Sequence, residues 1–526
     1  MRSRYSWMCH AAESVDLNDM PYAEARYEQE KGCLPGTRES LLREICDILN
    51  DPKEDAPRVC LLTGLAGSGK SSVAHSIAQL YDAQQRLASS YCFASSYVKR
   101  RNPRTLFSTI ARDLCDHDPR YKSALWRTVK DNRALCTSTS PSEQLERFIV
   151  EPSKALDSVG FQLVVIIDAL DESGDRANRR GLLEAISKQI AQNTLPKNLR
   201  FLITARPEND ILDAFSSASH FVHRKMGDVP EEVVERDIKR FIHHSLDRYS
   251  ELELSWPNGE WCHLLGHRSQ CLFQWAATAC KFIQQVGVNP CDQVNLLLHG
   301  DDRGTVRPLD KLYRTILRQL FTSDGARRSF QDVMAVILAL HEPLSLVSLS
   351  SLPNLNACLG VQYIIKPMGS LLDGVLDEDK PIRSLHTSFR DFLLDKARSS
   401  TFHIHILPHH SLSLGQALVA CMRDGLRFNI CDLQDSRLCN AAVPNLTNRI
   451  KEAIPPYLSY SCRYWMDHLQ YADCTPQLLK EITCFFKEFF PYWLEAISLL
   501  SHVSRVLPIL SAQGACTILS TWAKVC

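Results

Sequence analysis

The chain has 526 residues, of which 45% are hydrophobic and 23% charged, a composition that is typical of soluble globular proteins. This length corresponds to roughly three or four domains. Its 60 Lys and Arg residues balance its 60 Asp and Glu residues, so the basic excess expected of a nucleic-acid-binding protein is missing. The 20 Cys residues include no Cys-x-x-Cys pair, which disfavours a disulfide framework and a zinc site and favours buried thiols.

Two stretches bear on membrane attachment. Residues 1–19 carry charges throughout and contain no apolar core, so they do not resemble a signal peptide. The longest uncharged run, residues 506–523, contains Pro508, Gly514 and several Ser and Thr residues, which makes it too polar for a membrane span. The sequence therefore predicts a cytoplasmic protein without a membrane partner.

The first half of the chain alternates between helical and extended patterns. Residues 1–32 are polar and irregular, and residues 38–50 then carry apolar side chains at helical spacing. Apolar runs predict strands at residues 58–63, 89–94, 161–167, 199–204 and 220–223, with further helices at 72–80, 104–115 and 141–156. The third of these runs is almost entirely aliphatic, which suits a parallel strand covered on both faces. Strands that alternate with helices predict an α/β fold with a parallel five-stranded sheet.

From residue 231 onward the pattern is mainly helical. Helical spacing predicts helices within residues 262–283, 310–321, 327–340 and 389–395. Two apolar segments, residues 371–376 and 382–386, flank an acidic turn and predict a hairpin, and a hairpin among helices suggests a winged-helix domain. The remainder, to residue 526, is predicted to be all-helical and has no repeat period.

Residues 64–71 read Gly-Leu-Ala-Gly-Ser-Gly-Lys-Ser and fit the phosphate-loop pattern G-x-x-x-x-G-K-[ST]. The glycines let backbone N–H groups converge on phosphate oxygens, and the start of the following helix adds the positive end of its dipole. Lys70 is expected to reach the β- and γ-phosphates, and the Ser71 hydroxyl to ligate Mg²⁺. The nucleotide contacts expected in this segment are Gly64, Gly67, Ser68, Gly69, Lys70, Ser71 and Ser72.

Acidic residues follow the most apolar strand. Asp168 stands at its carboxyl end, where ligands bind in open α/β sheets, and we assign it to Mg²⁺. Asp171 and Glu172 follow closely, and one of them is expected to polarise the attacking water, although the sequence does not decide which. Arg206 ends the next apolar strand, where its guanidinium can contact the γ-phosphate and report its presence.

The strand predicted at residues 89–94 lies between the phosphate loop and the Asp168 strand along the chain. Many NTPases that use an additional acid for hydrolysis carry a strand inserted at that place in the sheet, so we expect these residues to supply it. The N-K-x-D signature of small GTPases is missing from the sequence. ATP and ADP with Mg²⁺ are therefore the expected ligands, and GTP is not excluded.

Together these motifs resemble the NACHT domain of the STAND class of signalling NTPases. The resemblance is closest to the fungal subgroup, whose core is also similar to the N-terminal NTPase region of nephrocystin-3-like proteins. It is carried by residues 33–38, 64–71, 168–172, 204–208 and 385–393. It implies an N-terminal segment over 1–32, an NTPase domain over 33–225, a helical domain over 228–305, a winged-helix domain over 306–403 and a helical region over 404–526.

The resemblance also implies roles for two residues outside the phosphate loop. Residues 33–38 are similar to the segment that packs near the adenine, which makes Arg38 a nucleotide-binding candidate. His386 matches a winged-helix histidine that contacts the β-phosphate of ADP and holds the closed state in related proteins. One departure concerns Ser269, Gln270 and Cys271, which stand where the family usually has a glycine before an aromatic-rich helix, so the contact of that helix with the nucleotide is open.

The function implied is that of an ATP/ADP-dependent switch with slow hydrolysis, in signalling or in innate-immunity or incompatibility responses. Protein partners and a homo-oligomer in the NTP state are expected. A metabolic kinase is disfavoured because no second substrate motif is found. The alternative is a catalytically weak nucleotide-binding scaffold, or a truncated gene product, since the sequence has only about 30 polar residues ahead of the NTPase and no repeats after it.

Overall fold

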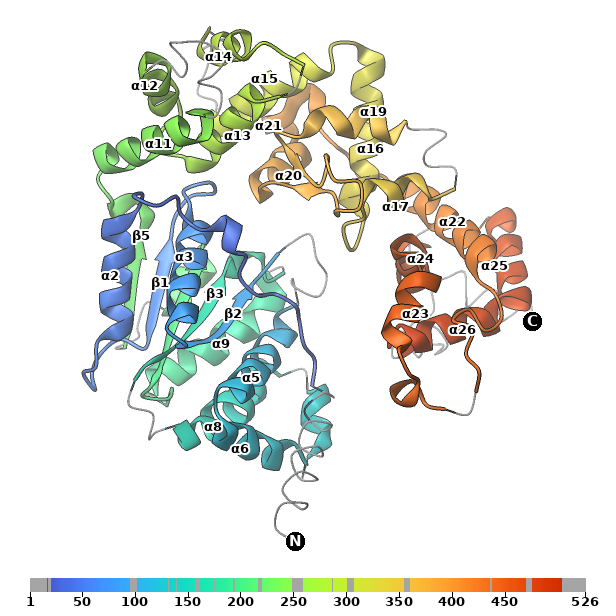
Figure 1. The fold of residues 1–526 in the computed structure, drawn as a ribbon, viewed down its shortest axis with the longest axis horizontal. Coiled ribbons are helices and arrows are strands. Elements are labelled where there is room, and N and C mark those ends of the chain that lie inside the picture. Colours follow the sequence, from blue (N-terminus) through green and yellow to red (C-terminus); the bar gives the residue numbers. More distant parts are fainter. Residues whose placement is uncertain are drawn as a thin grey trace. The chain divides into compact units, whose positions relative to one another are not determined.

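A computed structural model describes residue 17 and residues 20–503, apart from 95–101, 131, 139, 157–160, 175, 193, 216–219, 248–258, 286, 300–306, 354–359, 436–437 and 470–474. The contacts divide the chain into two compact units (Figure 1). The first comprises Met1–Gln284 and Asn289–His299, and the second comprises Gln285–Val288 and Gly300–Cys526. The domain boundaries expected from the sequence remain predictions.

The first unit is built on a sheet of five parallel strands in the order β2-β3-β4-β1-β5, which confirms the predicted parallel α/β sheet. The strands are short and, except for β5, almost wholly buried. Their bounds are β1 Val59–Thr63, β2 Leu87–Cys92, β3 Leu163–Asp168, β4 Leu199–Ala205 and β5 Phe221–Lys225.

Alternate residues of the strands enter two separate cores, because successive side chains of a strand point to opposite faces. On one face, Cys60 and Leu62 of β1 pack with α2 (Glu39–Asn50) and α3 (Lys70–Ala83). On the other face, Val59 and Leu61 pack with a second group of helices. This group comprises α5 Leu106–His117, α6 Pro119–Lys130, α9 Arg176–Ala191 and α10 Asn209–Phe215. The short helices α7 Pro141–Gln144 and α8 Glu151–Ser153 flank the turn at Leu145–Val150, which also enters this core.

The strand inserted between the phosphate-loop strand and the Asp168 strand is β4, and the expectation that residues 89–94 supply it is wrong. Those residues overlap β2, which pairs with β3 alone and forms an edge of the sheet. Strand β4 pairs with β1 on one side and β3 on the other. Order along the chain misled the prediction, because the crossover helices of a parallel sheet allow sequential strands to be separated in space.

Several helices differ from the expected ones. Helices α6 and α9 were not predicted, since the charged residues Arg179 and Arg180 interrupt the apolar spacing of α9 and similar charges interrupt α6. The helix expected over residues 141–156 is present, but its hydrogen-bonding pattern changes along its length. Leu145–Val150 form a π-helical turn between the short α-helices α7 and α8. The described part of the N-terminal segment runs beside β2, where the Cys92 N–H donates to the Ala25 carbonyl at 2.8 Å.

The described helices that follow the sheet within the first unit are α11 Glu231–Leu246, α12 Gly259–Arg268, α13 Phe273–Ile283 and α14 Pro290–His299. The helical stretch expected over residues 262–283 is therefore two helices. The break falls at Gln270 and Cys271, which both adopt left-handed backbone with φ of 46° and 62°. Left-handed backbone is unfavourable for residues that carry a Cβ, so the chain turns here at a cost in backbone energy.

The second unit is mainly helical. It begins with α15 Pro308–Leu320, α16 Asp324–Ala339, α17 Leu346–Ser350 and α19 Val361–Ile365. The predicted hairpin is present as two very short antiparallel strands, β6 Leu372–Asp373 and β7 Arg383–Ser384. The helices that follow are α20 Thr387–Leu394, α21 Lys396–Ser399, α22 Pro408–Gly425, α23 Leu446–Ala453, α24 Pro456–Leu469, α25 Pro476–Glu488 and α26 Phe490–Leu499.

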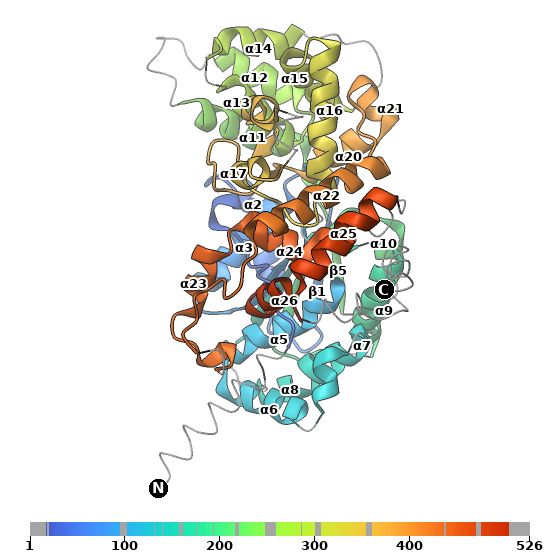
Figure 2. The same cartoon turned by 90° about the vertical axis from the view of Figure 1, so that its right-hand side faces the viewer.

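Figure 2 shows α24 and α25 beside α22, and α26 packs against α24 and α25. Their core is aromatic, with Trp465 lying 5.4 Å from Phe485 and 6.1 Å from Trp493 between ring centroids. Within the described ranges, no helix is both long enough and apolar enough to cross a membrane. The uncharged run at residues 506–523 lies outside the described residues.

Candidate functional site

The phosphate loop joins β1 to α3 in the strand–loop–helix arrangement that its sequence predicts. Gly67 and Gly69 take φ values of 83° and 97°, which residues with a Cβ rarely adopt, so glycine is needed at both positions. Helix α3 begins at Lys70, and the exposed Ser71 and half-buried Ser72 lie in its first turn. The N-terminus of α3 therefore opens directly onto the loop, as binding of an anion requires.

Lys70 turns its ammonium group back onto the loop. Its Nζ donates to the carbonyl oxygens of Gly64 at 2.9 Å and Leu65 at 3.1 Å. Burial lowers the pKa of Lys70, and the nearby carboxylates of Asp171 and Asp168 oppose this shift. The ammonium group is thus held against two carbonyl oxygens of the loop, and phosphate oxygens can replace these contacts.

Asp168 lies at the carboxyl end of β3 and only 4% of it is exposed. The Thr204 hydroxyl donates to its Oδ1 at 2.5 Å, and the Ala169 N–H donates to the same hydroxyl oxygen at 3.0 Å. Because the Ala169 N–H occupies a lone pair of the Thr204 hydroxyl oxygen, the hydroxyl proton of Thr204 is directed to the Asp168 carboxylate. Thr204 was not predicted as a site residue. It could have been, because it is a polar residue near the end of an otherwise apolar strand.

Asp171 and Arg206 are brought together at the neighbouring strand ends. The Arg206 Nε lies 3.0 Å from Asp171 Oδ2, and the Arg206 backbone N–H donates to Oδ1 at 2.9 Å. The Asp171 side chain is 5% exposed, and burial raises its pKa while the two Arg206 contacts oppose the rise. Both carboxylate oxygens of Asp171 are therefore engaged with Arg206. Glu172 is the next residue and ends the same short helical turn, Leu170–Glu172.

A buried arginine that the sequence did not single out supports this pair. Arg179 of α9 donates from Nη1 to the Asp171 carbonyl at 2.8 Å. Its Nη2 contacts Glu208 at 2.6 Å and Asp210 at 2.8 Å, and its side chain is 2% exposed. Arg179 thus ties the Asp171 turn to the segment that follows Arg206. In the sequence, Arg179 stands out only as a charged residue among the apolar positions of the segment that forms α9.

Arg38, the residue before α2, contacts the phosphate loop at Ser68. Its Nη2 donates to the Ser68 carbonyl at 3.0 Å, its guanidinium lies 4.9 Å from the Phe273 ring centroid, and its N–H donates to Asp237 at 2.9 Å. Arg38 is 4% exposed, and the described residues offer its Nε and Nη1 no hydrogen-bond partner. Buried donors without partners are rare in folded proteins, so a polar ligand group is expected there.

The first turn of α13 contacts the same loop. The Gln274 N–H donates to the Gly67 carbonyl at 3.1 Å, and the Phe273 ring lies 4.0 Å from the position that a Cβ on Gly69 would occupy. The helix therefore contacts the phosphate loop, and its contact with the nucleotide itself, left open by the missing glycine, stays untested.

His386 belongs to the second compact unit. It is the N-cap of α20, where its Nδ1 accepts from the Ser388 N–H at 3.1 Å. Tyr313 and Ser388 share a hydrogen bond of 2.8 Å between their hydroxyl groups beside this turn. The local structure thus gives His386 a capping role, and its predicted contact with ADP stays a prediction.

The residues of the first unit fit a nucleotide and Mg²⁺. The buried Ser68 Oγ, like the guanidinium of Arg38, has no hydrogen-bond partner among the described residues. Ser71 and Asp168 offer a hydroxyl and a carboxylate, which suit Mg²⁺, and Lys70 offers an ammonium group, which suits the phosphate oxygens.

This is the site of a P-loop NTPase. Residues 36–206, about a third of the chain, match the family model described as "Nephrocystin 3, N-terminal". The match spans the phosphate loop, Asp168, Asp171 and Arg206 in one segment. No curated protein matches the sequence.

Two solved structures are similar to parts of the chain. A Walker-type ATPase of Pyrococcus abyssi is 13% identical, with a TM-score of 0.30, over 66% of this chain and 93% of that chain. The structure of C. elegans PCH-2 is 12% identical, with a TM-score of 0.22, over 57% of this chain and 69% of that chain. Both scores are too low to carry an argument about this chain.

Proposed function

We propose that the protein is a cytoplasmic, ATP/ADP-dependent molecular switch of the NACHT type in the STAND class, similar to the fungal members, and that its slow NTP hydrolysis serves signalling. The observation that carries this proposal is the hydrogen bond from the Gln274 N–H to the Gly67 carbonyl. A helical segment that is bonded to the phosphate loop itself senses any change in the loop when phosphate binds or leaves. Coupling of a helical segment to the phosphate loop is expected of a nucleotide-dependent switch and is not required for phosphoryl transfer by a metabolic kinase.

The residues of the site support a slow NTPase. Lys70 is placed to exchange its two carbonyl contacts for phosphate oxygens, and Arg206 to exchange its Asp171 partner for the γ-phosphate. Between Ser71 and Asp168, a bound Mg²⁺ would neutralise charge on the phosphates. Because Arg206 must first leave a buried carboxylate, the resting arrangement opposes rapid turnover.

The test combines nucleotide titration with a single-turnover hydrolysis assay. Fluorescent ADP and ATP analogues should bind the wild type, and Lys70→Ala should lose this binding because it removes the fixed cation at the β- and γ-phosphates. Lys197→Ala is the matched control, since this lysine is 72% exposed and pairs with the surface residue Glu54 at 2.7 Å. Unchanged affinity in Lys70→Ala would contradict the site assignment. Binding without any hydrolysis would favour the alternative of a nucleotide-binding scaffold.

A further inference from the structure

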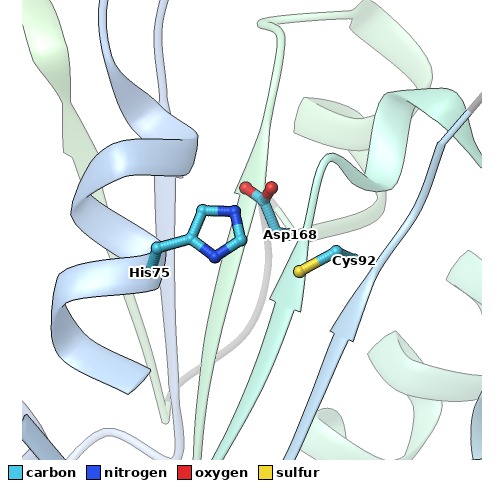
Figure 3. Close-up of side chains that lie close together, drawn as sticks. All are labelled: His75, Cys92 and Asp168. Carbon is cyan, nitrogen blue, oxygen red and sulfur yellow. The ribbon is translucent and has the colours of Figure 1, made fainter. Parts of the chain in front are cut away.

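A second group of side chains lies beneath the phosphate loop. His75 of α3, Cys92 at the end of β2 and Asp168 of β3 each place one potential ligand atom within 4.8 Å of the other two (Figure 3). His75 and Asp168 are each 4% exposed. By residue type alone, a histidine, a cysteine and an aspartate suggest a zinc site.

The hydrogen bond that His75 accepts argues against zinc. The Glu28 backbone N–H donates to its Nδ1 at 3.0 Å, so Nδ1 must carry a lone pair and Nε2 the ring proton. A metal ion on Nε2 would require the proton on Nδ1, where it would face the N–H of Glu28. The N-terminal segment thus sets the tautomer of a buried histidine and makes its other nitrogen a donor.

That donor faces the proposed Mg²⁺ ligand. In Figure 3 the edge of the His75 ring that carries Nε2 points toward the Asp168 carboxylate. One carboxylate oxygen, Oδ1, already accepts from Thr204. The described contacts include no direct hydrogen bond between His75 and Asp168, and two polar groups separated by more than hydrogen-bond distance are commonly bridged by a water molecule.

We propose that His75 is a positioning residue of the Mg²⁺ site, whose Nε2–H holds a water molecule that donates to Asp168. With Thr204 on Oδ1 and this water on the same buried carboxylate, Asp168 is fixed in orientation and its remaining lone pairs face the water shell of the ion. Partners of metal ligands of this kind commonly change metal affinity by ten- to a hundred-fold. The inference rests on the proposed nucleotide function.

The experiment measures the Mg²⁺ dependence of ADP-analogue binding, which needs no turnover. His75→Phe keeps the volume and removes the donor, and it should raise the Mg²⁺ concentration for half-maximal binding by roughly ten-fold. His75→Gln retains a side-chain N–H near the position of Nε2 and should restore part of the loss. Binding in EDTA should be the same in all variants. His117→Phe is the control, because His117 bonds the Leu87 carbonyl from α5, away from the loop.

A wild-type Mg²⁺ dependence in His75→Phe would overturn the proposal, as would an equal loss of binding with and without Mg²⁺. A Zn²⁺ titration provides an independent check. Stoichiometric Zn²⁺ binding that is lost in both His75→Phe and Cys92→Ser would overturn the tautomer argument. If the wild type binds no nucleotide in any condition, the proposed function itself fails, which distinguishes that result from a failure of the His75 inference alone.

Discussion

Asp171 and Glu172 are adjacent in the chain, and the charges of both carboxylates act on Lys70 of the phosphate loop. The sequence left open which of them polarises the attacking water. In the structure the buried Asp171 is held through both carboxylate oxygens by Arg206, and its carbonyl is held by Arg179. A carboxylate with both oxygens engaged is poorly placed to accept a proton from water, so Glu172 is the better candidate for the general base.

We predict that Glu172→Gln keeps ATP binding and lowers single-turnover hydrolysis by at least about a hundred-fold, the usual effect of removing a general base. Asp171→Asn should instead weaken the ion pair with Arg206, which frees this arginine for the γ-phosphate and raises the affinity for ATP relative to ADP. Rapid-quench hydrolysis and nucleotide titration of both variants measure the two effects. If Asp171→Asn loses hydrolysis while Glu172→Gln retains the wild-type rate, the assignment must be reversed.

For His386 the capping role and the predicted ADP contact can be separated by substitution. His386→Ala should speed ADP release by roughly ten- to a hundred-fold, which corresponds to one charge-assisted hydrogen bond. His386→Asn should release ADP equally fast, because asparagine lacks the reach of the imidazole but caps a helix well. Only the alanine variant should lose about 1 kcal/mol of stability with the cap. Stopped-flow ADP off-rates equal to wild type would leave His386 as a cap alone.

At the scale of elements, the break between α12 and α13 places the N-terminus of α13 against the phosphate loop. Two consecutive left-handed residues, Gln270 and Cys271, turn the chain there. Such residues cost roughly 1–2 kcal/mol each and persist where the surrounding structure requires them. Here they allow the first turn of α13 to reach the loop, with the Gln274 N–H on Gly67 and the Phe273 ring beside Arg38.

Gln274 tests this connection, because a proline in the first turn of a helix removes an N–H that makes no bond within the helix. Gln274→Pro should therefore leave α13 formed while breaking the contact with Gly67. We expect a several-fold change in the ratio of ATP to ADP affinity, measured by fluorescence titration. Gln274→Ala keeps the N–H and should behave as wild type. If Gln274→Pro and Gln274→Ala have the same ratio of ATP to ADP affinity, the contact between α13 and Gly67 does not couple the helix to the nucleotide.

For the whole molecule, the proposed switch predicts assembly that depends on nucleotide. Size-exclusion chromatography with light scattering should show a monomer with ADP and a larger species with a non-hydrolysable ATP analogue. Lys70→Ala should elute identically in both conditions, because it cannot bind the phosphates. Identical monomeric elution of the wild type with both nucleotides would argue that the chain does not assemble by itself.

The sequence alone determined features whose causes are local. The apolar run of β3 predicts a buried parallel strand wherever it is placed, and the glycine spacing of residues 64–71 encodes a loop whose left-handed residues need no tertiary partner. Asp168 and Arg206 were predicted as site residues because one ends and the other directly follows an apolar strand, and the carboxyl ends of parallel strands meet at one edge of a sheet.

Only the tertiary structure decided which of these groups touch. The insertion of β4, the pairing of Asp171 with Arg206 and the stacking of Arg38 on Phe273 join segments that are distant in the chain. The tautomer of His75 likewise depends on a backbone N–H from the N-terminal segment. Hydrogen bonds and ion pairs act over a few ångströms, whereas sequence patterns describe one element at a time, so the chemistry of such contacts is defined only when the sheet brings its strands together.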